Sequence, residues 1–320
     1  MIPNPVPKGS GRLTSRKIEL GQFRLNPKLN KRTGKDEITQ IVGYCVGCAQ
    51  DKFNVDLYAL CVMSNHFHMV LRDNDANLPW FLAEVHRNIA QCVNRMQKKK
   101  GAFWNRDRAG QTWLPTATDI FLKILYVMLN PVAAGLVQFQ KNWPGLVTKP
   151  EDFISEKGVL YKRPYYYFKS NGKMPKSTRL VYSIPPGYDS MDRKSFAKYL
   201  AEKIKIKERH IRKNRKGKRF LGRHKILKMN PFSTPKNGTK EGGFNPAVAC
   251  HDKELRIKCQ AWLKNFRIVY RECWLEYKRG NRKVKFPYGT FKIAWEHPVR
   301  VERKFSAEAD QLELVLPEFV

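Results

Sequence analysis

The stretch that most constrains the fold of this chain is Val55–Arg72, which reads VDLYALCVMSNHFHMVLR. Two apolar runs flank Ser64 and Asn65, and these two residue types favour tight turns. The stretch therefore predicts a hairpin whose strands are Val55–Met63 and His66–Arg72.

The second apolar run opens with His66, Phe67 and His68. Because side chains alternate between the two faces of a strand, both imidazoles should project from one face, and Phe67 and Met69 from the other. Two neutral imidazoles on one face are half of a divalent-metal site. For the pair alone, partly buried histidines with hydrogen-bond partners are the better explanation, so a second element has to complete the site.

Apolar residues at helical spacing on both sides of the hairpin predict helices. The predicted elements are, in order, a strand at Arg16–Leu25, a helix from Asp36 to about Lys52, the hairpin, a helix at Pro79–Lys98, and a short apolar helix that Thr118 or Asp119 caps and Pro131 stops. This order favours an α+β fold, a ferredoxin-like antiparallel sheet with helices on one face. Residues 1–14 are rich in Pro, Gly and Ser and are expected to be a flexible arm.

Beyond about residue 150 the composition of the chain changes. From Arg193 to Lys228, 16 of 36 residues are Lys or Arg, and only Glu202 and Glu208 are acidic. Asp252–Arg279 predicts a long amphipathic helix, and the segment FPYGTFKIAW after it predicts a turn and a strand. The expectation is a basic, mainly helical C-terminal extension over residues 151–320.

The net charge points to the partner. The chain has 61 Lys and Arg against 28 Asp and Glu, which gives +33 at pH 7. Such an excess repels itself unless a polyanion is bound, so nucleic acid is the expected partner. An anionic membrane is the other polyanion, but neither a terminal amphipathic anchor nor a run of about 18 apolar residues supports it.

The cysteines and the first residues bear on the compartment. Seven scattered cysteines suit reduced thiols better than a disulfide framework, and the chain opens without the apolar segment of a secretory signal, so a cytoplasmic location is expected. Cys45 and Cys48 have the spacing of half a zinc site or of a redox pair. No second CxxC accompanies them, and Cys45 falls on the apolar face of a predicted helix, so neither role is expected.

Tyr126 and Asn130 are the candidates that could complete the histidine site. They are four residues apart on the helix that precedes Pro131, so they share one helical face. Taken singly, Tyr126 is more ordinarily a core aromatic with its hydroxyl at the edge, and Asn130 a cap of the helix end.

The motifs LYALCVMSNHFHMVL, FWNR, ILYVMLNPVAAGLV and NWP occur in this order over roughly residues 12–148. Together they resemble the REP-associated and insertion-sequence single-tyrosine transposases of bacteria, which are HUH-type nucleases. The resemblance implies an HUH nuclease domain at residues 15–150, followed by the basic extension at 151–320 as a DNA-binding part. It also implies a bacterial, nucleoid-associated protein that acts as a monomer or a homodimer.

By the same resemblance, His66, His68 and Asn130 would bind Mg²⁺ or Mn²⁺, and Tyr126 would be the nucleophile. The implied reaction nicks and rejoins single-stranded or hairpin DNA through a 5′-phosphotyrosine. A phenol is a poor nucleophile at neutral pH unless it is positioned and its charge is stabilised, which such a metal would do. Two rival functions remain open: a non-catalytic nucleic-acid-binding protein that keeps the fold, and an RNA-binding or RNA-processing factor.

Basic residues near aromatic ones are the candidates for contact with nucleic acid. His86 has no partner at ligand spacing and is expected at the surface or facing DNA. Trp104 and Trp113 could stack on unpaired bases or could both be core residues. The candidate contacts are Lys98, Lys99, Lys100, Trp104, Arg106, Arg108, Arg212, Lys213, Arg215, Lys216, Lys218 and Arg219.

Overall fold

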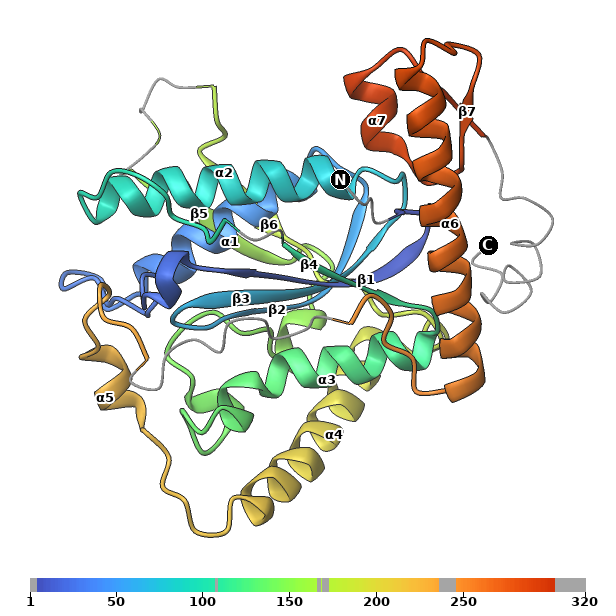
Figure 1. Ribbon diagram of the computed structural model, residues 1–320. Coiled ribbons are helices and arrows are strands. Elements are labelled where there is room, and N and C mark those ends of the chain that lie inside the picture. Colours follow the sequence, from blue (N-terminus) through green and yellow to red (C-terminus); the bar gives the residue numbers. More distant parts are fainter. Residues whose placement is uncertain (1–4, 107–108, 166–167, 169–172, 236–245, 303–320) are drawn as a thin grey trace.

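The centre of the structure, a computed structural model, is a four-stranded antiparallel sheet in the order β2-β3-β1-β4 (Figure 1). The described residues are 5–106, 109–165, 168, 173–235 and 246–302. The strands are β1 (Ser10–Lys17), β2 (Val55–Val62), β3 (His66–Asp73) and β4 (Gly110–Leu114). Helix α1 (Glu37–Gln50) joins β1 to β2, and α2 (Leu78–Met96) joins β3 to β4. This order of strands and helices is ferredoxin-like, so the predicted α+β class is confirmed.

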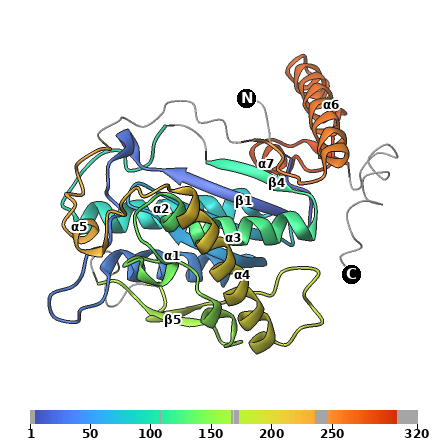
Figure 2. The same cartoon turned by 90° about the horizontal axis from the view of Figure 1, so that it is seen from below.

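Helices cover both faces of this sheet. In Figure 1, α1 and α2 lie above the sheet and are the layer that the sequence predicts. Helix α3 (Ala117–Ala133) lies on the opposite face against β1, β2 and β3, and α4 (Arg193–Asn214) packs along α3 (Figure 2). The second layer forms because α3 is apolar on nearly every side and must bury most of its surface.

Helix α3 begins before, and ends after, the residues that the sequence predicts for it. Thr116, not Thr118 or Asp119, is its N-cap, and Asp119 is the partner of Thr116 in a capping box. Pro131 does not stop the helix, because the amides of Ala134 and Leu136 bond to the carbonyls of Asn130 and Pro131 and complete a last turn.

The first strand is the main error of the sequence prediction. Ser10–Lys17 form β1 at the centre of the sheet, so the arm expected at residues 1–14 and the strand expected at Arg16–Leu25 are both wrong. The strand buries polar groups, which hides the usual alternation. The Arg12 guanidinium is buried and donates to the Ser10 hydroxyl at 3.2 Å and to the Pro5 carbonyl at 2.6 Å. Burial lowers the pKa of Arg12 to about 10, and the carboxylate of Asp73 opposes that shift.

The change in composition near residue 150 does not mark the edge of the folded core. Hairpin strands β5 (Val159–Lys162) and β6 (Ser177–Leu180) pack on α1, and the main hydrophobic core includes Phe153, Leu180, Phe196, Leu200 and Ile226. The short elements of this region are the 3₁₀ turns η2 (Gln140–Asn142) and η3 (Pro150–Phe153) and helix α5 (Arg223–Leu227), and a further turn, η1 (Glu19–Gly21), follows β1. The described residues between 151 and 227 therefore pack on the same core as the sheet.

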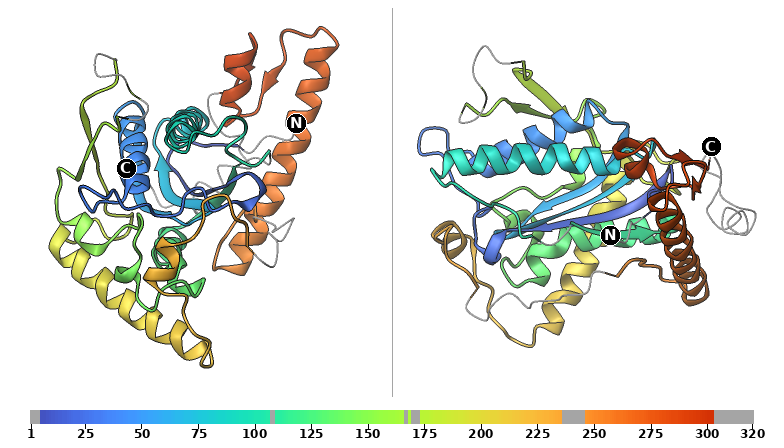
Figure 3. Two further views of the ribbon diagram at one scale, coloured as in Figure 1. Left: turned by 90° about the vertical axis from the view of Figure 1, so that its left-hand side faces the viewer. Right: turned by 45° about the horizontal axis from the view of Figure 1, so that its top comes forward.

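The remaining elements form a separate corner beside β4 (Figure 3). Helix α6 (Lys253–Lys278) confirms the long amphipathic helix, whereas the strand predicted over FPYGTFKIAW is wrong: only β7 (Lys285–Phe286) is extended there, and α7 (Phe291–Glu296) is helical. Strand β8 (Arg300–Val301) pairs with β7. Gly289, with φ +95°, ends the extended run, and one turn of helix then buries Ile293. No described helix is long and apolar enough to cross a bilayer.

The contact of α1 with the β5–β6 hairpin yields a test of this single core. A Cβ added at Gly43 would collide with the ring of Tyr161, so Gly43→Ala should lower the free energy of unfolding by about 1–3 kcal/mol. Denaturant unfolding measures the change. In a Tyr161→Ala background the same substitution should have a much smaller effect, because the ring is gone. Equal effects in both backgrounds would contradict this packing.

Candidate active site

His66 and His68 lie on the face of the sheet that α3 covers. Their ring centroids are 4.8 Å apart, and on β1 they pair with Lys17 and Ser15. Phe67 projects to the other face, where its ring centroid lies 5.6 Å from that of His86 on α2. The alternation predicted for this strand is therefore present.

Tyr126 on α3 stands next to this pair. Its ring centroid lies 5.8 Å from that of His68, with the rings steeply tilted at 73°. The side chain is 47% exposed, although its neighbours Leu125 and Val127 are buried. The amine of Lys123 lies 5.3 Å from the centre of the Tyr126 ring. A hydroxyl-bearing ring thus reaches solvent, and through it a substrate, beside two imidazoles and a positive charge.

Asn130, the third predicted ligand, follows Tyr126 by one turn of α3 and is buried. Its i,i+4 spacing places it on the same face of the helix as Tyr126. The structure thus places it on the helix that faces the histidines.

The hydrogen bonds and pKa values of the two histidines bear on whether they could bind a metal. Asn65 accepts a hydrogen bond at 2.7 Å from Nδ1 of His66 when that nitrogen is protonated, which leaves Nε2 with its lone pair. Nδ1 of His68 is buried and has no hydrogen-bond partner among the described residues. Burial, together with the charge of Lys17, lowers the pKa of His66 to about 4. Burial, then His66 and Lys17, lower the pKa of His68 to about 3. Both rings are therefore neutral at neutral pH, which is the form that binds metals.

The types of these three side chains are compatible with a hard, exchangeable divalent ion. Two neutral imidazoles and an amide oxygen would leave coordination positions open for water and phosphate oxygens. Nδ1 of His68 is buried and lacks a hydrogen-bond partner among the described residues, and a bound ion or another ligand would supply one.

The structure also groups three residues that the sequence interpretation did not assemble. Ligand atoms of Asp119, Cys250 and His251 all lie within 4.8 Å of one another. Asp119 and His251 are 132 residues apart, so no local spacing could have revealed the group.

The predicted nucleic-acid contacts separate into exposed and packed residues. Those that are exposed are Lys98, Lys99, Lys100, Arg106, Lys213, Lys216, Lys218 and Arg219. Arg108 lies outside the described residues. Arg212 and Arg215 are half-buried and make structural contacts: Arg212 lies 3.6 Å from the carboxylate of Glu208, and Arg215 bonds to the carbonyls of Lys218 and Arg219. Their role as DNA contacts stays a prediction.

The exposed basic loop after α4 is bonded to the segment that follows α3. The amides of Leu221 and Gly222 bond to the carbonyls of Gly135 and Leu136, just after the end of α3. Further along, the carbonyl of Ile226 accepts from the side chain of Asn26, which in turn bonds to Ser64 in the turn before His66. The loop and α5 thus connect the end of the tyrosine helix to the histidine hairpin.

Trp104 and His86 pack on each other against the sheet. Trp104 donates from Nε1 to the carbonyl of His86 at 2.8 Å and packs against Phe67 and Phe103; it is half-buried, and its role in stacking on bases stays a prediction. His86 is half-buried between Phe67 and Trp104, so it is not a fully exposed surface residue. Trp113 is buried. A tryptophan close to basic residues in sequence does not reveal which face of the chain it occupies.

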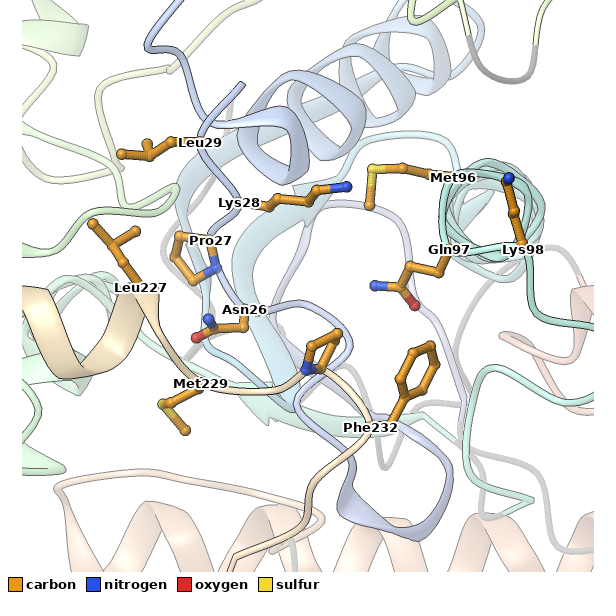
Figure 4. Close-up of a pocket in the computed structure, with 11 residues that line it drawn as sticks. Asn26, Pro27, Lys28, Leu29, Met96, Gln97, Lys98, Leu227, Met229 and Phe232 are labelled. Atoms are coloured by element: carbon orange, nitrogen blue, oxygen red, sulfur yellow. The ribbon is translucent and has the colours of Figure 1, made fainter. Parts of the chain in front are cut away.

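A cavity of about 550 Å³ lies between the end of α2 and the segment that follows α5 (Figure 4). In Figure 4 the amine of Lys28 and the amide of Gln97 point into it, and Phe232 lies across from them. Apolar walls with a few polar groups suit a planar ligand such as a nucleobase.

Fold and site together define an α+β protein with a ferredoxin-like sheet, in which a histidine pair on the central hairpin faces an exposed tyrosine on a covering helix. No protein-family model matches the chain, and no curated protein matches it. Among solved structures, it is similar to that of the REP-associated tyrosine transposase bound to a REP hairpin, with 16% identity and a TM-score of 0.35. The match covers 54% of this chain and 94% of that chain. A similarity of this size shows neither the family nor the activity of the chain.

The packing of His86 predicts a pH dependence of stability. Burial, aided by the charge of Arg16, lowers the pKa of His86 from 6.5 to about 3. Between these values the unfolded chain binds a proton that the folded chain does not, so stability falls as the pH is lowered, by up to about 1.4 kcal/mol per pH unit. His86→Phe removes this term and should make the slope of unfolding free energy between about pH 6 and pH 4 shallower by about one proton. Denaturant titrations across that range measure it, and an unchanged slope would contradict the packing of His86 between Phe67 and Trp104.

Proposed function

We propose that this chain is a divalent-metal-dependent, single-tyrosine nuclease and strand transferase that acts on single-stranded or hairpin DNA. The observation that carries the proposal is the exposed Tyr126 ring beside His68, with His66 next to it. Tyr126 shares the exposed side of α3 with Leu122, and a nucleophile must be accessible to its substrate. All these residues belong to one chain, which supports a site that is complete in a monomer.

The proposed step is a transfer of one phosphodiester. Oη of Tyr126 forms a bond to phosphorus while the bond from phosphorus to the DNA 3′ oxygen breaks. The phenol proton passes to that 3′ oxygen, so the products are a 5′-phosphotyrosine and a free 3′-hydroxyl. Attack by a 3′-hydroxyl reverses the step and rejoins a strand without an external energy source.

Each residue of the site has a separate task in this proposal. His66, His68 and Asn130 would hold Mg²⁺ or Mn²⁺, which polarises the phosphate and offsets developing negative charge. Asn65 orients the ring of His66. The amine of Lys123 lies close enough to Tyr126 to favour both the phosphate and the anionic phenol oxygen.

The charge distribution supports a nucleic-acid substrate. The chain carries +33, and its exposed basic residues include Lys213, Lys216, Lys218 and Arg219, just before the point at which the loop bonds to the end of α3. A single strand or a hairpin suits a nucleophile fixed on a helix, because a phosphate in a stiff duplex is hard to place in line. The cavity beside Lys28 and Gln97 can accept an unstacked base near the same hairpin.

Formation of the covalent intermediate tests the reaction. Wild-type protein incubated with labelled single-stranded hairpin DNA and Mg²⁺ should form a covalent adduct that survives denaturing electrophoresis. Tyr126→Phe should form none, because it lacks the nucleophilic oxygen, and removal of the divalent ion should abolish the adduct in the wild type.

Tyr165→Phe is the matched control, since Tyr165 is also an exposed tyrosine, and it should form the adduct normally. An adduct with Tyr126→Phe would overturn the assignment. Binding without an adduct in any variant would favour the non-catalytic alternative, and reaction only with an RNA hairpin would favour the RNA alternative.

The loop after α4 should contribute to affinity through phosphate contacts. Replacing Lys213, Lys216, Lys218 and Arg219 with Ala should weaken binding and reduce the slope of log K against log salt by up to about 3. Fluorescence anisotropy at several salt concentrations measures this slope. The control replaces Lys157, Lys162, Lys173 and Lys176, four exposed lysines on and around the β5–β6 hairpin. If both sets lower the slope equally, the loop has no special role.

A further inference from the structure

We infer that Asp119, Cys250 and His251 form a second metal site, selective for zinc, that fastens the start of α6 to the start of α3. This inference does not depend on the proposed nuclease activity, because none of its residues belongs to the His66–Tyr126 site. It concerns how the C-terminal part of the chain is held to the helix that carries Tyr126.

The geometry brings three ligand atoms together. All lie within 4.8 Å of one another, and Nδ1 of His251 is 2.9 Å from Oδ1 of Asp119. Around a tetrahedral zinc ion, ligand atoms are roughly 3.5 Å apart, given bonds of about 2.0–2.3 Å. Small side-chain rotations therefore suffice to close the three atoms around an ion.

The donor set distinguishes this site from the histidine pair. A thiolate, an imidazole and a carboxylate are ligands that zinc accepts, whereas a thiolate is a poor ligand for Mg²⁺. Asp119 and Cys250 are buried, but the side chain of His251 is 50% exposed. The fourth position therefore opens toward solvent, where water can fill it.

The carboxylate of Asp119 is already oriented for this role. Its Oδ2 accepts from the hydroxyl of Thr116 at 2.8 Å in the capping box, which leaves Oδ1 facing His251. Such a hydrogen bond behind a ligand fixes its direction.

The protons in the cluster balance when an ion binds. Without metal, the thiol of Cys250 and Nδ1 of His251 each supply a hydrogen bond to Asp119. On binding of Zn²⁺, the S–H bond of Cys250 breaks, a zinc–sulfur bond forms, and the thiol proton goes to solvent. The proton on Nδ1 of His251 moves through solvent to Nε2, so that Nδ1 binds the ion through its lone pair and the ring stays neutral, and no oxidation or reduction is involved.

The site lies at a junction between distant parts of the chain. The strand-like segment before it bonds to β4, where the amide of Trp113 donates to Ala247 and the amide of Ala249 donates to Trp113. The amide of His251 donates to Asp119 at 2.8 Å, and Asp252 then caps α6. An ion here would hold α6 about 10 Å along α3 from Tyr126, which is seven residues further on.

Metal analysis of the intact protein tests the inference. A His66→Ala/His68→Ala background removes the other candidate site. In this background, protein dialysed against Zn²⁺ and then metal-free buffer should retain one zinc per chain. With Co²⁺ in place of zinc, a sulfur-to-cobalt charge-transfer band should appear in the near ultraviolet, because Cys250 supplies a thiolate.

Cys250→Ser should lose the band and the retained zinc, whereas Cys273→Ser, at a half-buried cysteine outside the cluster, should keep both. His251→Gln changes a half-exposed side chain and should weaken zinc binding at least tenfold with unchanged circular dichroism, which settles the matter if Cys250→Ser fails to fold. No retained zinc in the background protein, or a band that survives Cys250→Ser, would overturn the site and show the cluster to be a hydrogen-bonded joint only. Neither result would affect the adduct test of Tyr126.

Discussion

The packing of α3 against the open face of the sheet is the contact on which the rest of the structure depends. The backbone of β1 and the side chains of α3 are close together: a Cβ added at Gly11 on β1 would lie 2.7 Å from Cδ1 of Ile120 on α3. With so little space between backbone and helix, α3 has one register on the sheet, and that register sets Tyr126 beside His68. A slip of the helix by one residue would turn Tyr126 by about 100° and separate the two rings.

The hairpin and the tyrosine helix could be predicted from the sequence because local periodicity determines them. Alternation fixes the faces of His66 and His68, and the four-residue spacing fixes Tyr126 relative to Asn130. That the two elements meet is a tertiary fact, which pattern alone could not give. The resemblance to single-tyrosine transposases supplied that expectation, and the structure brings Tyr126 next to the histidines.

The errors of the sequence prediction share one cause: polar or aromatic side chains are packed against partners that are far away in the chain. An arginine is ordinarily a surface residue, yet Arg12 is buried, donates to the carbonyl of Pro5 and interacts with the carboxylate of Asp73. His86 was expected at the surface, yet it packs on Phe67 and Trp104. The cluster of Asp119 and His251 was missed for the same reason. Charge counting likewise could not separate Arg212, which pairs with Glu208, from its exposed neighbour Lys213.

The way the basic loop is attached has a consequence for how the protein can change. The loop is held to the end of α3 by backbone hydrogen bonds from Leu221 and Gly222 to Gly135 and Leu136. The side chains of Lys216, Lys218 and Arg219 take no part in that attachment. Substitutions at these three positions can therefore change the charge of this surface while the loop keeps its attachment to the end of the tyrosine helix. The fold separates the anchoring of this loop from its surface charge, so the two can change independently.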